Sequence, residues 1–175
     1  MQQETSYAKA IGRKYPEAVV IAVARDPQGY CNPITLGWSM IVSGEPPMLA
    51  VAINAGAHSV GAIRHSRAFV LAFPSAAQAE EALFYGTRSG RDVHKLEAYG
   101  AATQPATAVD GVLLSDAVAN FECVLESETP TGDHIVFVGR VVASHAHSDP
   151  SLERLYSLGG GALGPALPGD TLAQR

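Results

Sequence analysis

The residues that could do chemistry in this chain gather in short segments, and the richest of these is a polar loop. Ser89, Gly90, Arg91 and Lys95 bring a hydroxyl group, a permissive backbone and two cations close together. Phosphate groups are bound by such sets, because N–H donors, hydroxyl groups and positive charge all stabilise the anion. An ordinary solvated loop has the same composition, so the loop alone leaves both interpretations open.

A second candidate phosphate contact is Ser59. Ser59, Ala62, Ile63 and Ser66 recur at helical spacing, which predicts a short helix that Ser59 caps. Helix N-termini present unpaired N–H groups to anions. A plain N-cap without a ligand is the alternative.

The segment 32–54 could receive a flat polar ring. It carries Thr35, Gly37 and Ser39 among small side chains, breaks at Glu45-Pro46-Pro47 and enters a second apolar run. Such a surface offers backbone N–H and hydroxyl donors without bulk. Trp38, the single tryptophan, packs in the core or forms a wall against a bound aromatic ring.

Other motifs carry little chemistry. Residues 159–164 contain a formal G-x-G-x-x-G, but too little chain follows for a dinucleotide-binding unit. His145 and His147 lack the further ligands of a metal site and are interpreted as exposed residues at a strand end, so no metal site is predicted. His134 follows Gly132-Asp133 and is either a surface residue or a titratable ring at the mouth of a pocket.

Composition bounds the class of protein. The chain has 175 residues, 47% apolar and 17% charged, with a net charge of −5. We expect one folded domain over residues 1–175, with part of its surface buried against a second subunit, and no nucleic-acid or membrane partner. Two distant cysteines and the lack of a visible signal peptide predict a cytoplasmic protein.

The pattern of elements favours short strands. Strands are predicted over 17–24, 34–42, 48–54, 68–73, 120–128 and 134–145, with helices from Ser59 and from Ser75, and a five-residue hairpin connection over 129–133. These elements suit a mainly β, mostly antiparallel small barrel with its core at about 15–160. Residues 161–175 are predicted to be a tail.

Taken in order, these segments resemble the flavin reductase-like, FMN-binding split-barrel proteins, which include flavoredoxin and the reductase components of two-component monooxygenases. The matching segments are 32–39, 46–47, 58–59, 89–91, 95–96, 121–123 and 132–134. Their order and spacing are specific, although no single motif is. Two positions depart from the family pattern: Ala57 stands where Arg is frequent, and His94 where Asp is frequent. The first removes a cation and predicts weak or exchangeable flavin binding.

The resemblance implies a six-stranded antiparallel Greek-key split β-barrel with a few short helices, which forms a homodimer and binds FMN. It implies that the flavin ring and ribityl chain contact Asn32, Thr35, Leu36, Gly37, Trp38 and Ser39, with backbone contacts from Ala52, Ile53 and Asn54. The phosphate would contact Ser59, Ser89, Gly90 and Lys95. His134 would be the catalytic residue, beside the exposed face of the ring.

The implied activity is that of an NAD(P)H:flavin oxidoreductase. Its cofactors would be FMN, or FAD as a substrate, with NADH or NADPH as donor, and its partner a flavin-dependent monooxygenase component or another electron acceptor. Hydride transfer to flavin N5 needs placement rather than a protein acid or base, and the chain has no convincing catalytic dyad. Two alternatives stay open: a flavoredoxin-like FMN electron carrier without NAD(P)H activity, and a non-redox ligand-binding barrel.

Overall fold

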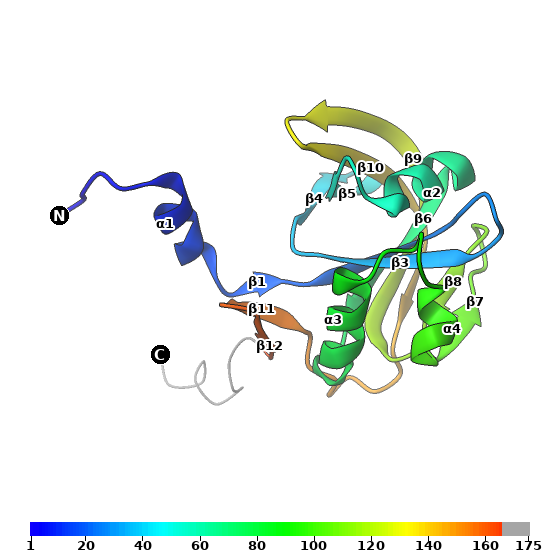
Figure 1. The fold of residues 1–175 in the computed structure, drawn as a ribbon. Helices are drawn as coiled ribbons and strands as arrows, with labels where there is room; N and C mark the ends of the chain where they lie inside the picture. The colour runs from blue at the N-terminus through cyan, green and yellow to red at the C-terminus, as the bar shows by residue number, and fades with distance from the viewer. Residues whose placement is uncertain (166–175) are drawn as a thin grey trace.

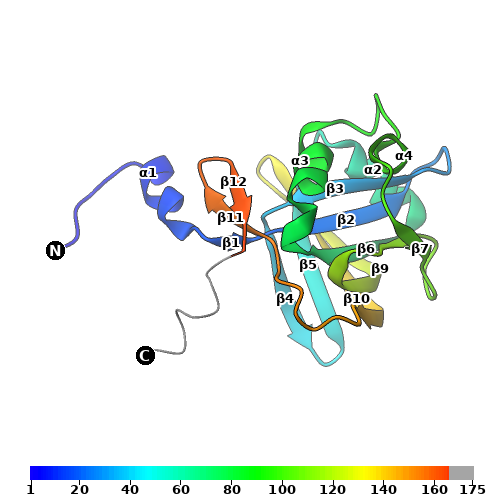
Figure 2. The same ribbon diagram turned by 90° about the horizontal axis from the view of Figure 1, so that it is seen from below.

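A computed structural model gives the fold and describes residues 1–165 (Figures 1 and 2). The strands are β1 (Glu17–Ala18), β2 (Val20–Arg25), β3 (Cys31–Leu36), β4 (Ser39–Gly44), β5 (Pro47–Asn54), β6 (Ala68–Pro74), β7 (Thr103–Pro105), β8 (Val112–Leu114), β9 (Ala117–Thr131), β10 (His134–Ala146), β11 (Tyr156–Gly159) and β12 (Ala162–Gly164). The α-helices are α1 (Tyr7–Ile11), α2 (His58–Ser66), α3 (Ala79–Thr87) and α4 (Lys95–Tyr99), and the 3₁₀ helices are η1 (Gly12–Lys14) and η2 (Ala76–Gln78).

The main sheet has seven antiparallel strands in the order β3-β2-β6-β9-β10-β5-β4. The neighbours β2–β6 and β10–β5 are not consecutive in the chain, and β3 also contacts β5, so the sheet curls back on itself. The mainly β, antiparallel prediction is therefore confirmed, with one strand more than the six expected.

The extra strand arises at Gly37-Trp38. The single strand predicted over 34–42 was wrong, because the chain leaves the sheet after Leu36 and re-enters it at Ser39 on the opposite edge. Periodicity misses this break, since the residues on both sides of it have strand propensity.

The core lies on both faces of β2. Val20, Ala22 and Ala24 belong to the cluster inside the curled sheet, whereas Ile21 and Val23 pack against α3 and the segment around β8. Because side chains alternate along a strand, a strand buried on both faces has a continuous apolar run, as this one does.

The hairpin of β9 and β10 is tighter than predicted. Thr131 pairs with His134, so only Gly132 and Asp133 form the loop. Gly132 has φ 62°, a left-handed value that glycine adopts without steric cost. This turn places His134 at the first position of β10, opposite Asn54 of β5.

Helix α2 begins two residues earlier than the predicted cap implies. Its N-cap is Ala57, so the prediction that Ser59 caps the helix was wrong. The Ser59 hydroxyl accepts a hydrogen bond from the Asn32 amide rather than from a helix N–H group. Helix α3, by contrast, follows η2, in which Ser75 and Gln78 form a capping box as the sequence indicates.

A small sheet of β1, β11 and β12 lies beside the body, and α1 stands off from it (Figures 1 and 2). Strand β12 falls within the tail predicted over 161–175, and the part of that prediction from residue 166 onward lies outside the described residues. No helix in residues 1–165 is long and apolar enough to cross a membrane.

Candidate functional site

A cavity of about 390 Å³ opens between α2, the C-terminal end of α3 and the loop that leads into α4. It brings together the predicted residues Asn54, Ser59, Ser89, Gly90 and Lys95 from four separate segments of the chain. Its other lining residues are Ile34, Gly56, Ala57, His58, Tyr85, Gly86, Thr87, Arg88 and Arg91.

Lys95 is the most unusual group of this cavity. Its side chain is 3% exposed, and its Nζ donates one hydrogen bond, to the Tyr85 carbonyl oxygen at 2.9 Å. No carboxylate of the described residues forms an ion pair with it. Burial alone lowers the pKa of Lys95 to about 8. The cavity therefore holds a desolvated cation with unused hydrogen-bond donors.

Asn32 and Ser59 form a buried pair beside the cavity, which Ser59 lines. Asn32 Nδ2 donates to Ser59 Oγ at 2.8 Å, which leaves the Ser59 hydroxyl proton free for another acceptor. Asn32 Oδ1 is buried without a hydrogen-bond partner among the described residues. A Cβ at Gly90 would lie 2.0 Å from this oxygen, so only glycine permits the loop to approach so closely.

The charge of the cavity is one-sided. Arg88, Arg91 and His58 line it together with Lys95, and none of its lining residues in the described chain carries a carboxylate. Arg91 donates to the Gly56 carbonyl oxygen at 2.9 Å across the entrance. In a protein with a net charge of −5 this local excess of cations favours an anionic ligand.

A second, smaller hollow of about 210 Å³ lies on the outer face of the sheet. It contains the predicted residues Trp38, Ser39 and Ala52, with Val136 beside them. Ala52 pairs with Val136, and Asn54 pairs with His134, so these four side chains share one face of β5 and β10. We call the surface formed by Ala52, Asn54, His134 and Val136 the strip of β5 and β10. Asn54 also lines the first cavity, so this strip links the two hollows.

Trp38 and His134 meet over this strip. Their ring centroids are 4.5 Å apart at an interplanar angle of 36°. His134 Nδ1 lies 2.7 Å from Asp133 Oδ1, while Trp38 remains 49% exposed. The pair forms an aromatic wall that a planar ligand could contact.

Six predicted residues line neither hollow: Asn32 and His134, described above, and Thr35, Leu36, Gly37 and Ile53. Thr35 donates its hydroxyl proton to the Ala82 carbonyl oxygen of α3 at 2.6 Å, Leu36 packs against the core, and Ile53 is fully buried. Gly37 lies against the Glu17 side chain. Any contact from Ile53 or Gly37 must use backbone atoms.

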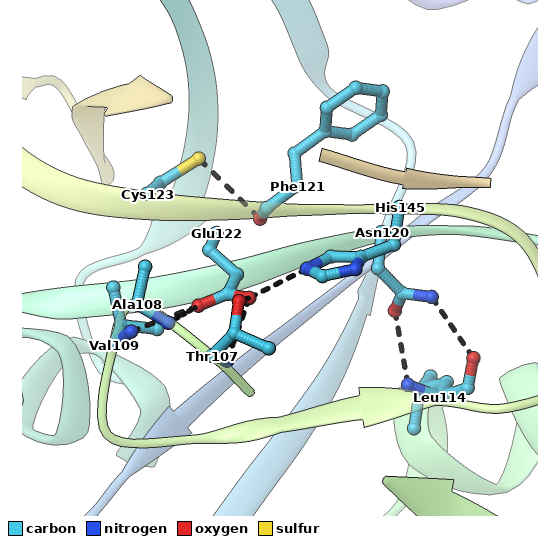
Figure 3. Close-up of polar contacts among 9 residues, drawn as sticks. All are labelled: Thr107, Ala108, Val109, Leu114, Asn120, Phe121, Glu122, Cys123 and His145. Carbon is cyan, nitrogen blue, oxygen red and sulfur yellow. Dashed lines mark hydrogen bonds and ion pairs between the residues drawn. The ribbon is translucent and has the colours of Figure 1, made fainter. Parts of the chain in front are cut away.

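A second buried polar cluster has a different character. Glu122, 0% exposed, accepts hydrogen bonds from the N–H groups of Thr107, Ala108 and Val109, from the Thr107 hydroxyl and from His145 Nε2 (Figure 3). The interpretation of His145 as an exposed strand-end residue was wrong, because its ring reaches inward to this carboxylate. The cluster fixes the segment before β8 to the sheet.

The sequence interpretation missed some cavity residues. Tyr85 and Gly86 contribute from α3, where an apolar helical pattern gave no functional signal. Asp26 does not line the cavity but lies 3.3 Å from the lining residue His58, and it occupies an ordinary turn sequence. Among the cavity residues, only the loop from Ser89 to Lys95 has a residue spacing that indicates phosphate binding.

The cavity fits the phosphate end of a flavin nucleotide on its own chemistry. The buried Lys95 ammonium group, the free Ser59 hydroxyl proton and the surrounding cations are complementary to a phosphate group.

Comparisons with known proteins agree with this fold. A 111-residue match to an uncharacterized protein from Archaeoglobus fulgidus is 30% identical and covers 63% of each chain, so the chain spans less than two thirds of that relative. An NADH-dependent FMN reductase from Streptomyces nodosus subsp. asukaensis is 28% identical over 81% of this chain and 74% of its own. The crystal structure of an FMN-binding protein from Thermus thermophilus superposes with a TM-score of 0.83 at 25% identity, covering 95% of this chain and 97% of that one.

The sequence model of the flavin reductase like domain matches residues 12–161, a span that contains both hollows and every residue that lines them. The chain belongs to the flavin reductase like domain family.

Proposed function

We propose that this protein binds FMN, with the phosphate group in the cavity of Lys95 and the ring over the strip of β5 and β10. The observation that carries the proposal is the buried Lys95 ammonium group, which has one hydrogen-bond partner and no carboxylate. A desolvated cation is costly unless an anion compensates it. The phosphate would receive hydrogen bonds from Lys95, from Ser59 and from the backbone of Ser89 and Gly90.

The strip suits the flavin ring in shape and polarity. Ala52 and Val136 are small apolar side chains that a planar ring can cover, and Trp38 with His134 bounds the strip. The Ala52 N–H group donates to the Trp38 carbonyl oxygen at 3.0 Å, which ties the Trp38 backbone to β5 beside the strip. We assign His134 to the open face of the ring as a positioning group.

We further propose that the protein is an NAD(P)H-dependent flavin reductase. When bound, flavin accepts a hydride from a reduced nicotinamide and can pass the electrons to an oxygenase or another acceptor. The residues of this chain bind the phosphate, orient the ring and limit access of water. The relative from Streptomyces, named as an NADH-dependent FMN reductase, supports NADH as the donor. Two free thiols accord with a cytoplasmic protein.

We also propose a homodimer. Met40, Ile41 and Val42 are exposed on the edge strand β4, and Tyr7 and Ile11 are exposed on α1. An apolar sheet edge and an apolar arm that stands off from the body are typical of surfaces covered by a second copy. Light scattering on the eluting protein tests this proposal, and a monomer at micromolar concentration would contradict it.

The test of function starts with the purified protein and FMN. Quenching of flavin fluorescence on titration measures binding, and loss of absorbance at 340 nm with NADH or NADPH measures reduction. Binding with nicotinamide oxidation above the rate of free FMN is expected. Binding without oxidation would support a flavin electron carrier, and no binding of FMN at millimolar concentration would support a non-redox ligand-binding protein.

A further inference from the structure

A fixed carboxylate stands behind the cavity. Asp26 follows β2 and is 5% exposed. Its Oδ1 accepts hydrogen bonds from the N–H groups of Tyr30 at 2.9 Å and Gln28 at 3.0 Å, and its Oδ2 lies 3.3 Å from His58 Nε2. Burial raises the pKa of Asp26, but the hydrogen bonds from Tyr30, His58 and Gln28 outweigh it and hold the pKa below its usual value. The carboxylate is therefore charged, and its free oxygen faces an imidazole ring.

His58 connects this carboxylate to the cavity. It is the first residue of α2, its side chain is 19% exposed, and its ring lies against Gly90. The second ring nitrogen, Nδ1, forms no hydrogen bond to any described residue. The N-cap Ala57 carries no charge, so His58 is the first side chain of α2 that could bring a positive charge to the anion-binding end of this helix.

The charges around His58 oppose each other. Arg88, Arg91 and Lys95 share its cavity, whereas the Asp26 carboxylate lies at its Nε2 atom. Arg64 of the same helix is paired with Glu128 and does not act on it. A phosphate dianion in the cavity adds negative charge on the ligand side, so the protonated ring becomes favourable when the ligand binds.

We propose that His58 is a titratable phosphate-binding residue, positioned by Asp26, and that it takes up a proton when FMN binds near neutral pH. The inference rests on the proposed function, because the ligand is the phosphate of FMN. Binding then follows a balanced step, in which one proton from solvent joins the His58 ring as the FMN dianion enters. FMN affinity consequently depends on pH in a way that riboflavin affinity does not.

Calorimetric titration at pH 7.0 in two buffers of different ionisation enthalpy counts the protons taken up. At this pH Lys95, with a pKa of about 8, is already protonated, and the FMN phosphate, with a second pKa of about 6, is largely a dianion. We expect the wild-type protein to take up about half a proton or more with FMN and none with riboflavin. His58→Gln and Asp26→Asn should abolish most of this uptake and weaken FMN binding about tenfold.

His65→Gln, an exposed position on the same helix, is the matched control and should retain wild-type proton uptake and affinity. Riboflavin affinity and circular dichroism report whether each variant is folded. If Asp26→Asn does not fold, the proton uptake of His58→Gln alone tests the inference. Proton uptake that persists unchanged in folded His58→Gln overturns the inference, although the proposed function stands. Failure of the wild-type protein to bind FMN overturns both.

Discussion

Glu122 and Lys95 are both buried charges, 0% and 3% exposed, yet their surroundings differ. Glu122 accepts five hydrogen bonds, from three backbone N–H groups, one hydroxyl and one imidazole. Lys95 donates one hydrogen bond, to a carbonyl oxygen, and has no ion-pair partner among the described residues. The pKa values follow this difference. The pKa of Glu122 is lowered, which favours its charged form. The pKa of Lys95 is also lowered, which disfavours its charged form.

The comparison separates a structural charge from a binding charge. Burial raises the pKa of Glu122, but the hydrogen bonds from Thr107, Ala108 and His145 outweigh it and lower the pKa to about 2. A carboxylate satisfied in this way stabilises the fold. A buried ammonium group with too few hydrogen-bond partners destabilises the ligand-free protein. The same group strengthens the binding of an anionic ligand that pairs with it.

The largest expected effect is the loss of stability when Glu122 is replaced. Glu122→Gln should lower the free energy of unfolding by about 3 kcal/mol at pH 7, because the amide must turn its NH₂ group toward donors and cannot match the carboxylate. FMN affinity should stay within twofold of wild type. The folded pKa lies below 4.5, so this stabilisation is complete above pH 4.5 and is lost as pH falls towards 2.

Urea denaturation from pH 7 to pH 3 measures this difference. Glu126→Gln, an exposed position on the same strand, is the control and should cost less than about 0.5 kcal/mol. Equal stability of Glu122→Gln and the control would remove the structural half of the comparison.

The second expected effect is a gain of stability, opposite to the loss expected for Glu122→Gln. Lys95→Met should raise the free energy of unfolding of the ligand-free protein by about 2 kcal/mol at pH 7, because it removes a desolvated charge. The folded pKa of about 8 lies below the unfolded value of 10.5, so the cost is full below pH 8 and disappears as pH rises to 10.5. Thermal unfolding at pH 7 and pH 10 tests this, with the exposed Lys9→Met as control. Destabilisation at both pH values would show that Lys95 is structural.

The third effect is on ligand affinity. FMN binding should weaken about tenfold between pH 7.5 and pH 9.5, since Lys95 loses its proton above a pKa of about 8 and no longer compensates the phosphate. Riboflavin binding should not change over this range. Fluorescence titration measures both, and a parallel loss of affinity for the two ligands would point to a change elsewhere.

The smallest effect concerns the Ser59 hydroxyl. Ser59→Ala should weaken FMN binding about fivefold, through loss of one hydrogen bond to a charged group. It should cost about 1 kcal/mol of stability, because Asn32 Nδ2 then loses its acceptor. Ser66→Ala, at the end of the same helix, should leave FMN affinity unchanged, and equal affinities of the two variants would exclude Ser59 from the site.

The sequence predicts the parts of this molecule that depend on local pattern. The apolar run of β2, the turn at Gly132 and the helix after Ser75 each follow from residue type and spacing. The break at Gly37-Trp38 does not, because it is set by where β3 and β4 join the sheet.

The site is predicted less well, for the same reason. The loop of Ser89 to Lys95 carries a phosphate-binding composition, and the family resemblance supplies its order with Ser59. The Asn32–Ser59 contact joins residues 27 positions apart, and Glu122 meets His145 over 23 positions. Such contacts exist only after folding, so no local signal distinguishes a satisfied buried charge from an unsatisfied one.

The most direct test of the account compares FMN with riboflavin, which differ by the phosphate, in the wild-type protein and in Lys95→Met. Fluorescence titration at pH 7 gives the four dissociation constants of this cycle. The account predicts that the wild-type protein prefers FMN by about 30-fold or more and that Lys95→Met removes most of this preference without changing riboflavin affinity. Equal affinity of the wild-type protein for both ligands, or a preference that survives in Lys95→Met, would contradict the assignment of this cavity to the phosphate.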